Sequence, residues 1–351
     1  MKLKKFIAVL FYCLIAAIPV AANDVYDSVP TFSPYYYAGK LKYKVLNEAL
    51  KELNYIRELI GVPNNVTLNS DYTNKAQHGA VLLDAIDRLT HTPSKPSDMN
   101  ESFYKLGYEA TTHGNLSEGK VYRDTYINGV KSKTEIFGGM TLSRSLKSCM
   151  DDSDPSNISR VGHRRWLMNP RLKQVGFGLS TRRGYAVTYL IEEFGKTGAL
   201  SPKEYAIYKR WLKWPIRENF ISWPSSKRPH PLTYFYKNSA WSVTLNSEVF
   251  EKINRKNLRV KLTRLSDNRA WNFDSFTSNG DFYIAEKNIA YDECIIFRPN
   301  NISGYKPGEQ WRVEIFGLKS NSRNVNIAYN VRFSNEKTGF DYDIPESDSK
   351  L

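Results

Sequence analysis

The sequence is poor in cysteine and histidine, with three Cys and five His residues in a chain of 351. One cysteine, Cys13, lies in an apolar stretch close to the N-terminus. The remaining two, Cys149 and Cys294, can form at most one disulfide bond. That number excludes a fold that depends on a framework of disulfide bonds. Two buried free thiols are the alternative to a single bond between the two halves of the chain.

Long apolar runs are also rare, and the clearest one extends over residues 6–22. It follows three lysines and ends in small residues just before Asn23. A basic start, a short apolar core and a small-residue site are typical of a secretory signal peptide. A retained membrane anchor is the alternative, although the run is short for a spanning helix and Pro19 interrupts it. The pattern predicts a secreted protein, extracellular or associated with a cell surface.

Acidic residues are outnumbered, since 50 Lys and Arg against 36 Asp and Glu give a formal net charge of +14. The basic residues are scattered along the chain and form no dense run. Such a charge suits solubility and contact with anionic surfaces, such as wall polymers or lipid headgroups. Together with the predicted export, this distribution argues against a nucleic-acid partner.

Helical periodicity dominates the first half of the chain. Apolar residues recur every three to four positions over 46–60 and predict a helix, and Asn69 or Ser70 can cap a second one. A third helix is predicted over 137–150, after a polar and loop-rich stretch at 94–135. Two strands around a turn are expected at 175–178 and 185–190. This mixture of elements predicts an α+β fold class.

The pattern changes to period two in the second half. Apolar and polar residues alternate over 241–245, 258–262, 311–315 and 325–333, which predicts half-buried strands. Six to eight strands over this region predict an all-β sandwich of immunoglobulin-like type. In the stretch before them, Trp211, Trp214 and Trp223 are expected to pack between the two halves. An exposed aromatic platform for carbohydrate is the alternative.

Two short motifs place a histidine in polar surroundings. Leu89-Thr90-His91-Thr92-Pro93 follows the predicted second helix, and Gly162-His163-Arg164-Arg165-Trp166 follows the third. Two histidines that are distant in sequence can form one pocket, as in many metal and acid–base sites. Two surface histidines in unrelated loops are the alternative.

The order of these motifs resembles the CAP superfamily, which includes cysteine-rich secretory proteins, antigen 5 and plant pathogenesis-related proteins, and bacterial secreted CAP-domain proteins in particular. The resemblance covers just under half of the chain. It implies an α-β-α sandwich with a central cleft that holds two His and two Glu residues, His91 and His163 being the two His. The matching residues follow in order: the helix Leu46–Ile60 with Asn54 and Arg57, the His91 motif, Gly114-Asn115-Leu116, Gly162–Pro170, Val175–Gly178 and Tyr185–Leu190.

With this resemblance, the chain divides into six segments. They are a signal peptide at 1–22, an extended N-terminal segment at 23–40, a CAP-like domain at 41–196, a linker with Trp and Pro at 197–223, a β-sandwich domain at 224–335 and a disordered tail at 336–351.

The sequence departs from the family at the Glu positions. Gly114 stands where the first Glu is expected, and the acids nearest to the second are Asp151, Asp152 and Asp154. Family roles that need a Glu are therefore not implied for this chain. The cleft or ligand-binding residues that we predict are His91, His163, Asn115, Asp152 and Arg164.

Zinc is the metal that this cleft suggests, with His91 and His163 as ligands. A firm zinc site needs three or four ligands, so an Asp from 151–154 or His113 would have to be the third. A polar cleft in which water and protein groups bind the imidazoles is the alternative. No other cofactor is predicted.

The acidic run at 151–154 has further interpretations. Its carboxylates can clamp Arg164 or Arg165, or cap the loop, by charge-assisted hydrogen bonds. They can also bind Ca²⁺ through oxygen, although the full EF-hand pattern is absent. Ser153 and Thr92 are the nearest hydroxyls, and we interpret both as caps or turn formers because no nucleophile elbow is visible.

The sequence thus predicts an exported binding or interaction protein without catalytic activity. Its ligand would be a lipid, a cell-wall glycan or a protein. A divergent metal-dependent or His-based hydrolase acting in the same cleft is the alternative, and a purely structural surface protein is the third. Catalysis is disfavoured because Gly114 has no side chain, and because Asp152, one methylene shorter than Glu, is expected to fall about 1 Å short of its histidine.

Overall fold

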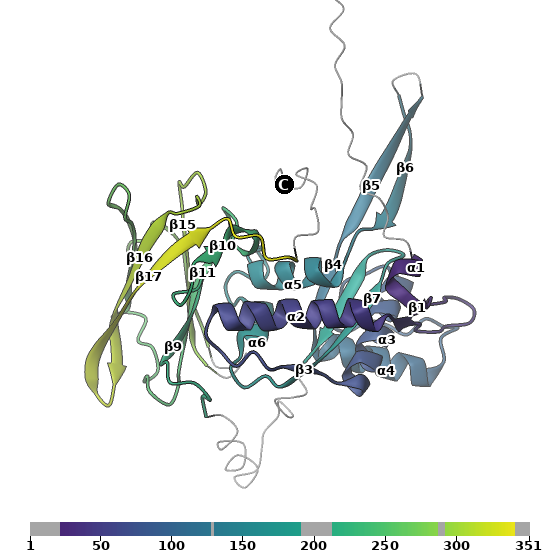
Figure 1. Ribbon diagram of the computed structural model, residues 1–351, viewed down its shortest axis with the longest axis horizontal. Helices are drawn as coiled ribbons and strands as arrows, with labels where there is room; N and C mark the ends of the chain where they lie inside the picture. The colour runs from purple at the N-terminus through teal and green to yellow at the C-terminus, as the bar shows by residue number, and fades with distance from the viewer. Residues whose placement is uncertain (1–21, 128–129, 191–212, 287–291, 341–351) are drawn as a thin grey trace, which may run out of the picture.

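The computed structural model describes residues 22–127, 130–190, 213–286 and 292–340 (Figure 1). The predicted signal peptide, apart from its last residue, and most of the predicted linker, with Trp211, lie outside the described residues. Within these ranges we find no helix with the length and apolarity that a membrane span requires.

The first half of the chain folds into three layers (Figure 1). Its middle layer is a sheet in the order β3-β7-β8-β4, antiparallel except between β3 and β7. Helices α3 and α4 pack on one face, and α2 and α5 on the other. The elements are α2 (Tyr43–Leu59), β3 (Thr67–Leu68), α3 (Ser70–Ile86), α4 (Glu101–Thr112), β4 (Gly114–Glu118), α5 (Leu142–Asp151), α6 (Gly162–Met168), β7 (Gln174–Ser180) and β8 (Tyr185–Tyr189).

Local sequence explains how α3 lies against this sheet. Asn69 is its N-cap, and the side-chain oxygen accepts the N–H groups of Asp71 and Tyr72. Two glycines of β7 then allow the helix backbone to approach. A Cβ on Gly176 would lie 2.1 Å from the carbonyl carbon of Tyr72, and one on Gly178 would meet the backbone of the next turn equally closely.

Two predictions for the stretch 94–150 are wrong. The region predicted as loop contains α4 and a hairpin of β5 (Lys120–Ile127) and β6 (Val130–Gly138), which projects from the body of the molecule (Figure 1). The third helix consequently begins at Leu142. The residues of the two strands show no regular apolar face in the sequence, which is why the period does not predict the hairpin.

The N-terminal segment is not extended as predicted, because it doubles back on itself. After α1 (Ala22–Val25), β1 (Tyr26–Ser28) pairs antiparallel with β2 (Lys40–Leu41). Gly39 makes this return possible with a φ of +73°.

From Phe220 to Ser334 the described chain forms two sheets, here called the two-sheet unit. One sheet has the order β10-β17-β16-β12-β13 and the other β14-β15-β11-β9. Aromatic side chains join their inner faces: ring centroids lie 5.9 Å apart for Trp241 and Trp311 and 5.3 Å apart for Phe273 and Phe297. The strands are β9 (Phe220–Trp223), β10 (His230–Pro231), β11 (Trp241–Leu245), β12 (Arg259–Arg264), β13 (Arg269–Phe273), β14 (Gly280–Ala285), β15 (Cys294–Pro299), β16 (Gln310–Ser320) and β17 (Arg323–Ser334).

The end of the described chain also differs from the prediction. Residues 336–340 are not a free tail, since the carbonyl of Phe340 accepts hydrogen bonds from Lys147 (3.0 Å) and Ser143 (3.4 Å) on α5. The Phe340 ring lies 5.9 Å from that of Tyr55 on α2. The remainder of the predicted tail lies outside the described residues.

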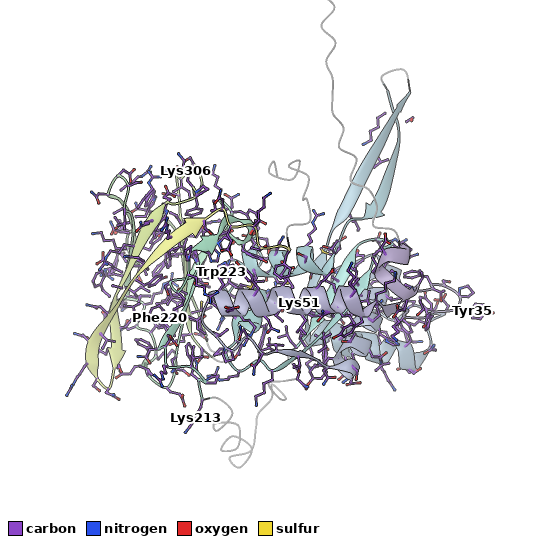
Figure 2. All side chains as sticks on the ribbon, viewed as in Figure 1. Tyr35, Lys51, Lys213, Phe220, Trp223 and Lys306 are labelled. Atoms are coloured by element: carbon purple, nitrogen blue, oxygen red, sulfur yellow. The ribbon has the colours of Figure 1, made fainter. Side chains whose placement is uncertain are left out.

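A continuous apolar core connects the first half to the two-sheet unit. Trp214 and Trp223 are buried in it, as the packing interpretation predicts, and Trp223 lies inside the molecule rather than on a surface platform (Figure 2). Asp292 adds polar contacts: its carboxylate accepts from the Trp214 indole (3.0 Å) and pairs with Arg171 (2.7 Å). Cys149 and Cys294 are buried free thiols, so the disulfide alternative is wrong.

Arg164 makes the central polar contact between the two parts. It is fully buried, and its guanidinium donates to the carbonyls of Met150 (2.6 Å) and Asp151 on one side. On the other side it donates to the carbonyl of Ala240 (2.8 Å) and the hydroxyl of Ser242 (3.1 Å) in the two-sheet unit. A single side chain therefore satisfies carbonyl groups from both parts.

Replacing Arg164 with Met is expected to lower the free energy of unfolding by at least about 3 kcal/mol, because buried carbonyls on both sides lose their donor. Urea denaturation measures this loss. Arg160→Met, at an exposed arginine of the preceding turn, is the matched control and should cost less than about 1 kcal/mol. Equal losses in the two variants would contradict the role assigned to Arg164.

Stability should also depend on pH through His230. This imidazole is fully buried, and burial lowers its pKa to about 3 from the ordinary 6.5. The folded protein keeps this imidazole neutral, while the unfolded chain takes up a proton below pH 6.5. The free energy of unfolding therefore decreases as the pH is lowered below 6.5, by up to about 1.4 kcal/mol per pH unit. His230→Phe should flatten this slope between pH 6 and 4 in chemical denaturation. Phe333→Leu, beside the same ring, should leave the slope unchanged.

Candidate functional site

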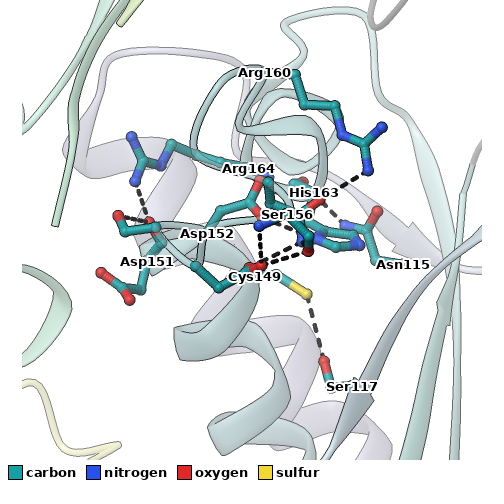
Figure 3. A network of polar contacts seen from close by, with 12 residues as sticks. Asn115, Ser117, Cys149, Asp151, Asp152, Ser156, Arg160, His163 and Arg164 are labelled. Atoms are coloured by element: carbon teal, nitrogen blue, oxygen red, sulfur yellow. Dashed lines mark hydrogen bonds and ion pairs between the residues drawn. The ribbon is translucent and has the colours of Figure 1, made fainter. Parts of the chain in front are cut away.

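The centre of the candidate site is a pair formed by His163 and Asp152 (Figure 3). Asp152 ends α5 in the left-handed conformation (φ 43°), which turns its side chain toward the start of α6. One carboxylate oxygen lies 2.8 Å from Nδ1 of His163, and the other accepts the backbone N–H of Arg164 (3.3 Å). The Asp152 side chain is 1% exposed and that of His163 21%. Nδ1 therefore carries the proton, and Nε2 is the atom that remains for a ligand.

His91 is held in the same way by a carbonyl. Its Nδ1 lies 2.6 Å from the backbone oxygen of Thr111 on α4, which makes Nδ1 the protonated nitrogen and leaves Nε2 as an acceptor. Burial lowers the pKa of His91, and the positive charges of His163 and Arg160 lower it further. His163 and Arg160 thus act on His91 through their charges.

Asn115 supports the site from within. This residue of β4 is buried, and its side-chain amide donates to the backbone oxygen of His163 at 2.9 Å. We predicted it as a cleft residue, but the structure makes it a positioning residue that fixes the start of α6 relative to the sheet.

Arg164 is a second correction to the predicted site. Its side chain is fully buried in the contact with the two-sheet unit, so it is not accessible to a ligand. The predicted carboxylate clamp is absent from its hydrogen bonds: backbone carbonyls hold the guanidinium, and the carboxylate of Asp151 accepts from the Ser239 hydroxyl instead.

The turn that carries Asp154 forms the rim of the site. Its carboxylate accepts the N–H of Ser156 (3.0 Å) and the amide of Asn157 (2.9 Å), which matches the loop-capping interpretation. Asn157 in turn accepts from Arg160 at 3.1 Å. Sequence reasoning missed Arg160 and Asn157, and only their place just before the His163 motif could have pointed to them.

The glycine at the expected Glu position has a structural cause. A Cβ on Gly114 would lie 2.7 Å from the carbonyl oxygen of Ala110 and 2.9 Å from the side chain of Val187. No side chain fits at that point without movement of the helix end or the sheet. Among the described residues, the carboxylate that contacts an imidazole of the site is that of Asp152.

The residues present do not fit a firm metal site. Across the described ranges, no group of three or more His, Cys, Asp and Glu side chains is arranged to hold an ion. Zinc at His91 and His163 would have two ligands where three or four are needed. His113, the predicted third ligand, has its Nδ1 against Thr112 and the carbonyl of Glu109. The calcium interpretation of the acidic run fails for the same reason.

The predicted hydroxyl of Ser153 also serves local structure. Ser153 donates to the carbonyl of Asp151 (2.7 Å) and accepts the N–H of Ala240 (2.8 Å). Cys149 is buried next to Ser117, and burial raises the pKa of its thiol to about 12, which keeps it protonated. Neither group is available as a nucleophile for His163.

Replacing His163 with Ala is expected to raise the pKa of His91, because a nearby positive charge is removed. Arg160→Gln should act in the same direction, while His230→Phe, in the two-sheet unit, should have no effect. Titration of the imidazole resonances by NMR measures these shifts. An unchanged His91 titration in both cleft variants would show that the two histidines belong to separate sites.

Comparison with known proteins identifies the family of the first half of the chain. Residues 50–194 match the model of the CAP family, described as the cysteine-rich secretory protein family. No curated protein matches the chain at a significant level. The match covers the C-terminal part of α2, the sheet and both histidine motifs, so residues 50–194 of this chain form a CAP domain.

Proposed function

We propose that this protein is an exported interaction protein, and that its CAP domain binds an extracellular ligand in the cleft between His91 and His163. The observation that carries the proposal is the fixed orientation of both rings. Each imidazole donates through Nδ1 to a protein oxygen, which leaves the Nε2 atom of each ring as an acceptor. Such acceptors suit a lipid headgroup, a cell-wall glycan or a protein segment with hydroxyl or amide donors.

The rest of the chain supports an adhesive role. The strand orders β13-β12-β16-β17 and β14-β15-β11-β9 resemble the arrangement of an immunoglobulin-like sandwich. A module of this kind commonly mediates contacts at cell surfaces, although fold alone does not set function. The net charge of +14 would hold the protein near anionic wall polymers or headgroups.

Binding remains favoured over catalysis, but for a different reason from the one drawn from the sequence. Asp152 does reach its histidine, at 2.8 Å, so the expected shortfall of about 1 Å is wrong. Binding is favoured because, in the described part of the chain, the His163 ring lacks the partners that catalysis would need. Among the residues with described side chains, no hydroxyl or thiol is hydrogen-bonded to the His163 ring, and no third metal ligand is present.

A His-based hydrolase is the second candidate, and the buried Asp152 carboxylate favours it. An aspartate that holds Nδ1 leaves Nε2 as a general base able to activate water. Zinc would add Lewis-acid chemistry, but the donor set of this cleft does not hold it firmly.

Binding by the cleft is tested by cosedimentation with three probes: purified peptidoglycan, phosphatidylcholine vesicles, and vesicles that also contain phosphatidylglycerol. His91→Ala and His163→Ala should each weaken binding to the same probe at least tenfold, because each removes a hydrogen-bond acceptor. His113→Ala, at a histidine outside the pair, should bind as the unchanged protein does.

Two results would overturn the proposal. One is binding that survives in both cleft variants. The other is turnover of a peptide, ester or glycan substrate that disappears in both variants while circular dichroism shows them folded, which would establish the hydrolase. A metal analysis of the purified protein accompanies the assay and should find less than one zinc ion per chain.

A further inference from the structure

A second pocket lies on the CAP domain, over the N-terminal half of α3. Its volume is about 760 Å³, within the range of sites that hold small molecules or short chain segments. The walls come from α2, α3, α4 and the returning N-terminal segment, and no residue is shared with the histidine cleft. No residue of the two-sheet unit lines the pocket, and Tyr35, next to the lining residue Tyr36, lies at the end of the molecule away from that unit (Figure 2).

The outer wall of this pocket is fixed in place. Gln77 is buried and donates to the carbonyls of Ala38 (2.8 Å) and Leu179 (3.0 Å), which ties the N-terminal segment to α3 and β7. Tyr36 donates to the carboxylate of Asp98 at 3.1 Å. Because these contacts are made within the protein itself, binding does not have to order the wall.

The lining combines aromatic rings with neutral polar groups. Tyr37 and Tyr43 line the pocket with side chains on the surface, the two residues being 50% and 71% exposed. Around them stand hydroxyl and amide side chains, those of Ser70, Thr73, Asn74, Asn100 and Ser102. Within the described part of the chain, the side chains of Tyr43 and Asn74 form no hydrogen bond, and Asn100 uses only its oxygen, to cap α4. Several donors and acceptors are therefore available to a ligand.

The pocket carries little charge. Its lining contains no Asp or Glu, and its cationic candidates are Lys40 and His78. The Lys40 side chain is largely in solvent, with its ammonium group 4.0 Å from Asp27. Burial lowers the pKa of His78, which leaves this imidazole neutral at physiological pH. An anionic ligand would find no dedicated counter-charge here.

We propose that this pocket binds a neutral glycan chain, with sugar rings against Tyr37 and Tyr43 and sugar hydroxyls bonded to Asn74 and Asn100. A pyranose ring has apolar C–H faces that pack on aromatic rings, and a rim of hydroxyls that pairs with amides. An acyl chain would leave those amides without partners. This site lies beyond the proposed function, which concerns the histidine cleft alone.

The experiment is calorimetric titration of the full protein with four neutral probes, the hexamers of β-1,4-glucose, β-1,4-N-acetylglucosamine, β-1,4-mannose and α-1,4-glucose. At least one should bind saturably. Tyr43→Ala and Asn74→Ala should each raise the Kd for that probe at least tenfold. Both side chains are exposed and contribute little to the core, so the variants should remain folded.

Two controls separate this site from its surroundings. Tyr35→Ala removes a neighbouring tyrosine that is 83% exposed and does not line the pocket, and it should leave the Kd unchanged. His163→Ala should also have no effect, which distinguishes this pocket from the histidine cleft. The proposal is overturned if none of the four hexamers binds, if Tyr35→Ala weakens binding as much as Tyr43→Ala, or if palmitate binds and is lost in Tyr43→Ala.

Discussion

Burial of the Arg164 guanidinium is the constraint on which the arrangement of this protein depends. A buried cation is costly unless its donors are satisfied, and here the acceptors come from two separate parts of the chain. The carbonyls of Met150 and Asp151 belong to the CAP domain, while Ala240, just before β11, and Ser242, in β11, belong to the two-sheet unit. Separating the two parts would expose the core and leave these groups unpaired. The CAP domain and the two-sheet unit therefore stabilise each other.

The short helix α6 connects this contact to the candidate site. Neighbouring residues of one motif point in different directions: His163 toward the cleft, and Arg164 and Arg165 toward the two-sheet unit. The carboxylate of Asp152 contacts both, since it accepts from the His163 ring and from the backbone N–H of Arg164. Asp152 thus both orients the His163 ring and holds the backbone at Arg164, whose side chain contacts the two-sheet unit. A change in the orientation of the ring is therefore expected to affect this contact, and the reverse.

Sequence patterns predicted those parts of the fold in which burial follows a regular period. The apolar stripe of α2 and the alternation in β16 and β17 are of this kind, whereas all five residues of β11, predicted to be half-buried, are buried. The hairpin β5–β6 has no such stripe, and residues 336–340 are ordered by the distant contact of Phe340 with α5. In the site, motif order identified both histidines. The roles of Asn115 and Arg164 depend on long-range hydrogen bonds that spacing along the chain does not contain.

The position of α6 has a mechanical consequence. If the second unit is anchored to a surface and the CAP domain holds a ligand, tension between them is carried partly by the hydrogen bonds of Arg164 and by the Arg171–Asp292 ion pair. Arg164 and Arg171, which make these contacts, follow His163 closely in the chain. A pulling force on the protein would therefore act on the backbone that positions the His163 imidazole. The affinity of the proposed site for its ligand would then depend on the applied force.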